Sequence, residues 1–178
     1  MTTEEHYLVT AEKQFRRLKK LGEKAFAQVS DEAHFHVLLD QESNSLAVLI
    51  QHLRGNMTSR WTDFLTTDGE KVSRKRDTES DRDKKRTSNE LLDLWNEGWD
   101  RLFKSLTALK PSDLQKTITI RGEVHSVLEA MQRELVHYAM HVGQIVFLAK
   151  HVEAENWKSL SIPRGQSEKF LRRSPGNR

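Results

Sequence analysis

The feature that most constrains the fold is a long helical pattern that ends near residue 152. Its apolar residues recur at alternating steps of three and four, as in the a and d positions of a packed helix: Leu128, Met131, Leu135, Tyr138, Val142, Ile145, Ala149 and Val152. A second stripe, Glu134, His137, His141 and Gln144, runs beside this seam. His137 and His141 are four residues apart, so their rings lie one turn apart on the same helix face. The pattern predicts a core helix that carries two imidazoles at its edge.

Three further amphipathic patterns predict three more helices. With the last one, the expected helices span about residues 4–28, 42–65, 88–108 and 126–152. Ser43 or Asn44 is the candidate N-cap of the second helix, and Thr87 or Ser88 that of the third. Residues 116–124 alternate Thr and Ile before Arg-Gly, which predicts a short strand or β-hairpin before the last helix. We therefore expect an all-α four-helix bundle with one long polar crossover.

Composition predicts one soluble domain. The 178 residues are 36% hydrophobic and 31% charged, and the sequence shows neither a membrane-span pattern nor the layout of a signal peptide. We expect a cytoplasmic protein without membrane partners. Cysteine is absent, which excludes disulfides, thiolate metal ligands and a cysteine nucleophile. A tight metal site would have to use His and carboxylate groups.

Charge is concentrated in two segments. Residues 161–178 carry a net charge of +4, whereas the whole chain carries +3. Residues 1–160, the expected domain, therefore carry a net charge of −1. We expect 161–178 to be a flexible basic tail. Residues 70–87 mix both signs of charge, which favours a solvated, mobile loop, although the segment could instead fold over a site as a lid. Neither segment has interspersed aromatic residues, so we expect no nucleic-acid partner.

A third histidine makes a metal site conceivable. His52 stands beside the apolar face of the second predicted helix, and it would meet His137 and His141 if the two helices were neighbours. Three neutral imidazoles leave open positions on a divalent cation, as catalytic sites do. Such ligands suit Zn²⁺, Ni²⁺, Cu²⁺ or Fe²⁺. Three nearby side chains could orient a ring N–H or meet a metal-bound water: Glu134, Gln144 and Asn56.

Several segments resemble the DinB/YfiT-like superfamily of metal-binding helical proteins, and in part a Bacillus-type subfamily of undefined activity. They are NSLAVLIQHL (44–53), RWTDFLTTDGEK (60–71), GEVHSVLEA (122–130) and HYAMHVGQI (137–145). The resemblance implies a four-helix bundle, often a homodimer, that holds one divalent metal per chain on His52, His137 and His141. Zn and Ni are the favoured metals, with Fe, Cu or Mn as alternatives. Characterised relatives include a metal-dependent isomerase and thiol S-transferases that use bacillithiol, mycothiol or glutathione.

Two classes of function follow. In the first, the protein is a metal-dependent enzyme that transfers a low-molecular-weight thiol to an electrophile, or a related hydrolase. In the second, it is a non-catalytic dimeric binding or stress-response module, in which Trp61, Trp95 and Trp99 would contribute to an interface. An accessible pocket beside the histidines would favour the enzyme, whereas enclosure of all three rings by apolar side chains would favour the module.

Overall fold

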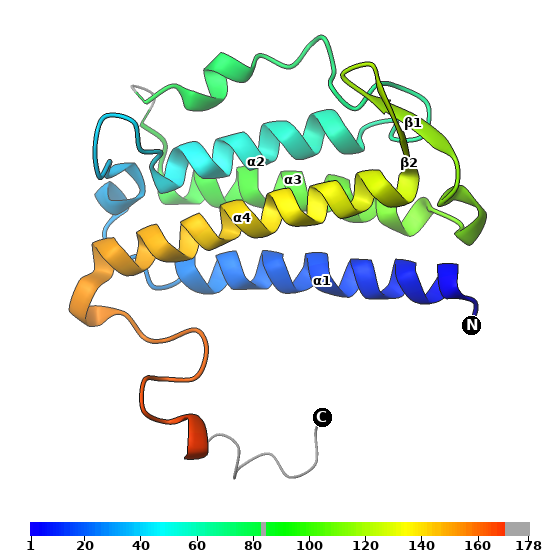
Figure 1. Cartoon of the computed structure of the whole chain (residues 1–178). Helices are drawn as coiled ribbons and strands as arrows, with labels where there is room; N and C mark the ends of the chain where they lie inside the picture. Colours follow the sequence, from blue (N-terminus) through cyan, green and yellow to red (C-terminus); the bar gives the residue numbers. More distant parts are fainter. Residues whose placement is uncertain (83–84, 170–178) are drawn as a thin grey trace.

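The computed structural model describes residues 1–82 and 85–169 of the chain and is mostly helical (Figure 1). Its main elements are four α-helices and one two-stranded antiparallel sheet: α1 Thr3–Phe26, α2 Leu46–Trp61, α3 Ser88–Ala108, β1 Thr117–Ile120, β2 Glu123–Ser126 and α4 Val127–Glu153. Four short 3₁₀ helices lie between or after them: η1 Glu32–His36, η2 Arg76–Ser80, η3 Pro111–Asp113 and η4 Ala154–Asn156. The predicted helices and the hairpin are confirmed.

The long helices pack mainly as two pairs, α1 with α4 and α2 with α3. α2 also contacts α4, and Figure 1 shows these two helices running in opposite directions. The polar segment that joins α2 to α3 passes over α2, and its 3₁₀ helix η2 packs on that helix. This arrangement places the faces of α2 and α4 that carry histidines beneath the polar segment.

Helix α2 is shorter than the expected span of 42–65. It begins at Leu46, because the N-cap is Ser45, whose hydroxyl accepts the N–H of Val48 at 3.3 Å. Ser43 instead bonds to Asp40 in the preceding turn. The predicted N-caps Ser43 and Asn44 were therefore wrong. The helix ends at Trp61, because Thr62 is extended and the following residue has a positive φ of 47°.

The N-termini of α3 and α4 agree with the sequence signals. Thr87 caps α3 and Ser126 caps α4, and each forms a capping box with a glutamate three residues later. In such a box the cap hydroxyl and the glutamate carboxylate each accept a backbone N–H that the helix leaves free. The last predicted helix therefore begins where its capping box indicates.

The core contains the tryptophans of α2 and α3. Trp61, Trp95 and Trp99 are at most 2% exposed, so they are core residues and do not form an accessible interface. Trp61 Nε1 donates a 2.9 Å hydrogen bond to the hydroxyl of Tyr138, which lies on the predicted seam of α4. Each such ring removes roughly 150–250 Å² from water, which makes this cluster a main source of fold stability.

Two expectations about the periphery can be compared with the structure. Residues 161–169 of the predicted tail are exposed, and the rest of the tail lies outside the described residues. Among the described helices, none combines the length and apolarity that a membrane crossing requires.

Candidate metal centre

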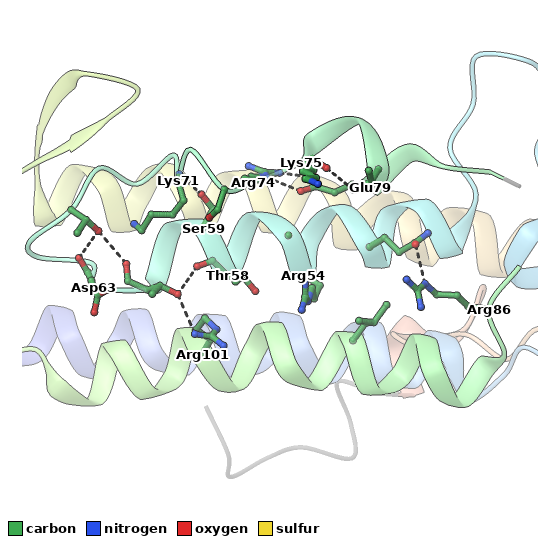
Figure 2. A pocket seen from close by; sticks show the side chains of 17 residues that line it. Arg54, Thr58, Ser59, Asp63, Lys71, Arg74, Lys75, Glu79, Arg86 and Arg101 are labelled. Carbon is green, nitrogen blue, oxygen red and sulfur yellow. Dashed lines mark hydrogen bonds and ion pairs between the residues drawn. The ribbon is translucent and has the colours of Figure 1, made fainter. Parts of the chain in front are cut away.

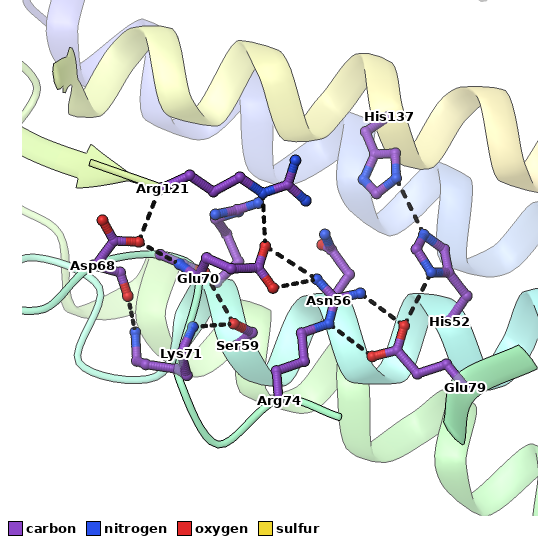
Figure 3. Close-up of polar contacts among 12 residues, drawn as sticks. His52, Asn56, Ser59, Asp68, Glu70, Lys71, Arg74, Glu79, Arg121 and His137 are labelled. Carbon is purple, nitrogen blue, oxygen red and sulfur yellow. Dashed lines mark hydrogen bonds and ion pairs between the residues drawn. The ribbon is translucent and has the colours of Figure 1, made fainter. Parts of the chain in front are cut away.

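The structure brings the three predicted ligands together. His52 projects from α2, and His137 and His141 project from α4. His137 Nε2 lies 3.4 Å from His52 Nε2 and 3.0 Å from His141 Nε2. The three rings are half-buried, and one nitrogen from each lies within 4.8 Å of the others. The contact between α2 and α4 thus brings the histidines of the two helices into one cluster. Figure 3 shows His52 of α2 and His137 of α4 side by side.

Each ring has a polar partner on its other nitrogen. His52 Nδ1 lies 3.1 Å from a carboxylate oxygen of Glu79, and His141 Nδ1 lies 2.8 Å from Gln144 Oε1. His137 Nδ1 lies 3.4 Å from Glu134 Oε2. Because Glu79 and Gln144 accept hydrogen bonds, the neutral rings of His52 and His141 are held with the proton on Nδ1 and the lone pair on Nε2. The carboxylate of Glu134 near His137 Nδ1 favours the same arrangement in that ring through its charge.

Three Nε2 lone pairs that face one another fit a cation. They repel each other unless a proton or a metal ion lies between them. Two nitrogens bound at about 2.0–2.1 Å to one Zn²⁺ stand roughly 3.0–3.4 Å apart for usual coordination angles, which matches the observed separations. Burial is the main reason why the pKa of His141 falls to about 4; the hydrogen bond with Gln144 opposes this effect, and the neighbouring His137 and His52 add to it. His141 is therefore neutral at pH 7, as a metal ligand must be.

Glu134 is fixed inside the protein by an arginine. The carboxylate is 1% exposed, and its Oε1 accepts a 2.8 Å hydrogen bond from Arg60 Nε on α2. Burial raises the pKa of Glu134, but the contacts with His137 and Arg60 outweigh this effect, so the pKa lies below its usual value. The ionised carboxylate is thus positioned to orient the His137 ring.

The other predicted supporting residues differ in their contacts. Gln144 reaches His141, as described above. Asn56 instead accepts a 2.9 Å hydrogen bond from the hydroxyl of Tyr138. Asn56 therefore helps to fix α2 against α4 beneath the histidines, and it also lines the adjacent pocket.

Glu79 was missed by the sequence analysis. It belongs to η2 in the polar segment, where we expected a solvated, mobile loop, but its side chain is only 10% exposed. Burial raises the pKa of Glu79, but hydrogen bonds with Arg74 and His52 outweigh this effect and keep the pKa low. Gly55 permits the approach, because a Cβ on that residue would lie 2.0 Å from Glu79 Oε1. A glycine one turn after His52 was the only local signal for this contact.

A network of ion pairs fixes the polar segment in place (Figure 3). Arg74, whose side chain is 5% exposed, makes two 2.7 Å hydrogen bonds to Glu79 and one of 3.1 Å to Glu70. Glu70 in turn accepts a 3.2 Å bond from Arg121 at the hairpin turn. The expectation of a solvated loop is therefore only partly right: most of the described residues of 70–87 are exposed, but paired charges bury Arg74 and Glu79.

Asp68 connects the same segment to the β-hairpin. Its carboxylate accepts the backbone N–H groups of Arg121 at 2.9 Å and Gly122 at 2.8 Å. These two residues have φ values of 56° and 77°, as a tight two-residue hairpin turn requires. The backbone N–H of Glu70, which donates to Asp68 Oδ1 at 2.6 Å, is the main reason why the pKa of Asp68 lies far below its usual value, and the N–H groups of Gly122 and Arg121 add to this effect against that of burial.

Two cavities flank the polar segment. The smaller, of about 350 Å³, is lined by His52 and His137 together with Asn56 and several arginines. The larger, of about 660 Å³, lies along α2 and α3 on the other side of the segment (Figure 2). Arg74 lines both. Only the smaller cavity contains histidines of the cluster among its lining residues, so it is the candidate substrate pocket.

The fold and the site together define a mostly helical protein with a three-histidine group that could hold a metal ion. The chain belongs to the family described as "Protein of unknown function (DUF1572)", whose model matches residues 2–166. No curated protein and no solved structure matches the chain.

Proposed function

We propose that this protein is a divalent-metal-dependent enzyme built as a DinB-like four-helix bundle. His52, His137 and His141 hold one metal ion, with Zn or Ni favoured. The substrates are a low-molecular-weight thiol of the bacillithiol type and an electrophile, and hydrolysis is the closely related alternative. The observation that carries the proposal is the pocket of about 350 Å³, since two of the three histidines line it.

The chemistry that such an ion supplies is Lewis acidity, which lowers the pKa of a bound thiol or water and makes it nucleophilic at neutral pH. The chain has no cysteine, so the nucleophile comes from substrate or solvent. Glu79 and Gln144 accept hydrogen bonds from Nδ1 of His52 and His141, and the carboxylate of Glu134 lies 3.4 Å from Nδ1 of His137. These three side chains keep the rings oriented. Their contribution is to present three Nε2 atoms at one point beside the pocket.

Metal content measured by elemental analysis tests the proposal. We expect about one metal ion per chain in protein purified without an affinity tag, and loss of the metal in His52→Ala and His137→Ala. His151→Ala is the matched control, because His151 lies on α4 outside the cluster. Turnover of a thiol with an electrophilic acceptor, abolished in the same two variants, is the next expected result. Absence of metal, with no uptake of added Zn²⁺ or Ni²⁺, would contradict the proposal.

The second candidate function is a non-catalytic module that acts as a homodimer. It is favoured by three exposed apolar side chains on α4, Val136, Met140 and Phe147, which are 71%, 53% and 62% exposed. Large apolar side chains gathered on one helix face are typical of interaction surfaces. A dimer in solution without turnover would support this alternative, whereas turnover would contradict it whether or not the protein is a dimer.

A further inference from the structure

We infer that the pocket beside the histidines binds an oxyanion, a carboxylate or a phosphate group, of the substrate through Arg76, Arg121 and Arg133. The inference deepens the proposed function. Only the role of the ligand as a substrate depends on that function, because anion binding can be measured without any turnover. It is carried by the charges that line the pocket.

Five arginines from four parts of the chain converge on this one pocket. Arg60 comes from α2, Arg74 and Arg76 from the polar segment, Arg121 from the hairpin turn and Arg133 from α4. Glu134 is the only acidic residue among the described lining residues. Such a concentration of guanidinium groups is typical of sites that bind carboxylate or phosphate.

The acidic partners do not neutralise this cluster. Arg60 pairs with Glu134. Arg74 pairs with Glu79 and Glu70, and Arg121 pairs with the same Glu70. Five arginines against these three glutamates leave a net charge of +2, before any metal ion is counted. Within residues 1–82 and 85–169, Arg76 and Arg133 have no ion-pair or hydrogen-bond partner.

Arg60 supplies independent evidence for a missing acceptor. Its side chain is 3% exposed, and its Nη1 has no hydrogen-bond partner. A buried cationic N–H without an acceptor costs free energy, so Arg60 adds positive charge beside the pocket that its pairing with Glu134 satisfies only in part. Arg60 lines the pocket and is fixed by Glu134, whereas the side chains of Arg76 and Arg133, which line the same pocket, are exposed.

The rest of the pocket indicates the size and the polarity of the ligand. Its volume of about 350 Å³ suits a small molecule and excludes a folded partner. Val136 and Met140, both largely exposed, form an apolar edge on α4. His52 and His137 also line this pocket. When the acid group of a ligand is bound by the arginines, the rest of the ligand therefore lies beside the histidine cluster.

Isothermal titration of the full chain with inorganic phosphate, and separately with butyrate, tests the inference. Titrations use the protein as purified and after metal removal. We expect saturable binding of at least one probe with a Kd of about 1 mM. This Kd corresponds to a binding free energy of about −4 kcal/mol, which two or three charge-assisted hydrogen bonds would supply. The Arg76→Gln/Arg133→Gln variant should bind roughly tenfold more weakly. Preference for phosphate indicates a phosphorylated substrate, and preference for butyrate a carboxylic acid.

The control variant is Arg17→Gln/Arg164→Gln, which removes the same charge at exposed positions outside the pocket. We expect it to bind the probe within about twofold of the wild type, since distant exposed charges are screened by salt. Absence of saturable binding by the wild type, or equal weakening in both variants, would overturn the inference. Neither result affects metal content, so failure of the anion site and failure of the metal site are distinguishable.

Discussion

Glu79 offers the sharpest test of how the metal centre is built. The substitution Glu79→Gln keeps the shape of the side chain but removes the charge that faces His52 Nδ1 at 3.1 Å. Residues that orient a metal-binding histidine in this way typically contribute roughly 10- to 100-fold to metal affinity, or about 1.4–2.7 kcal/mol. We therefore expect Zn²⁺ to bind Glu79→Gln roughly 10- to 100-fold more weakly than the wild type.

The same substitution also affects stability, which must be measured separately. Arg74 loses two 2.7 Å hydrogen bonds to a carboxylate but keeps Glu70 at 3.1 Å. Removal of one partner of a buried pair costs about 3–5 kcal/mol, and the remaining partner reduces this to roughly 1–3 kcal/mol. Urea unfolding of metal-free protein measures this cost, and competition with a chromophoric chelator measures metal affinity.

Two further variants separate orientation from general destabilisation. Glu97→Gln breaks a two-bond pair with Arg54, whose nitrogens lie 2.8–3.0 Å away, without contact with a histidine. This pair is more exposed than Arg74–Glu79, so its loss should cost less stability. Glu97→Gln should leave the Zn²⁺ affinity unchanged. Gly55→Ala keeps every charge but places a Cβ where Glu79 Oε1 now lies, so it should weaken Zn²⁺ binding as Glu79→Gln does. Wild-type affinity in both Glu79→Gln and Gly55→Ala would refute the orienting role.

Three other substitutions test the fold around the site by urea unfolding. Gly22→Ala should lower the free energy of unfolding by about 1–3 kcal/mol despite better helix propensity, because its Cβ would lie 2.5 Å from the Trp95 ring; a stabilised variant would contradict this packing. Tyr138→Phe leaves Trp61 Nε1 without an acceptor in the core and should cost about 1–3 kcal/mol, whereas no change would mean that the bond contributes nothing. Asp68→Asn should cost about 1–3 kcal/mol at pH 7, because backbone N–H groups that bond to the carboxylate lower its pKa. The low folded-state pKa stabilises the protein above about pH 4, and this contribution decreases as the pH falls further. The difference in unfolding free energy between Asp68→Asn and the wild type should therefore shrink in acid, and a difference that does not change with pH would exclude this linkage.

Local patterns predicted much of the fold. The seam of α4 was predictable because the spacing of its apolar residues repeats over many turns. Thr87 was one of the two predicted caps of α3, and Ser126 with Glu129 has the sequence pattern of a capping box. The hairpin turn was readable from Arg121-Gly122 between two short strands. The end of α2 could not be predicted from the sequence. Asp63 turns the chain there with a positive φ, which an aspartate does not by itself require.

The candidate site was only partly predictable, for a physical reason. Glu134 and Gln144 lie three residues from the histidines that they contact, so helix geometry alone brings them together. Glu79 lies 27 residues from His52 in a segment with no apolar pattern. Its position depends on Arg74 and Gly55, which are not neighbours of Glu79 in the sequence, and a mixture of charges in a sequence does not show which of them will pair.

The position of Glu79 has a consequence for the site as a whole. The segment that orients His52 also contributes Arg74 and Arg76 to the pocket, so docking of this segment completes both the proposed metal centre and the proposed anion site. Two ligands that favour the same docked state favour each other, and by linkage the effect is reciprocal. Metal on the histidines should therefore strengthen anion binding to the arginines, and an anion should strengthen metal binding. In Glu79→Gln this coupling should weaken, because the residue that joins His52 to Arg74 no longer carries a charge.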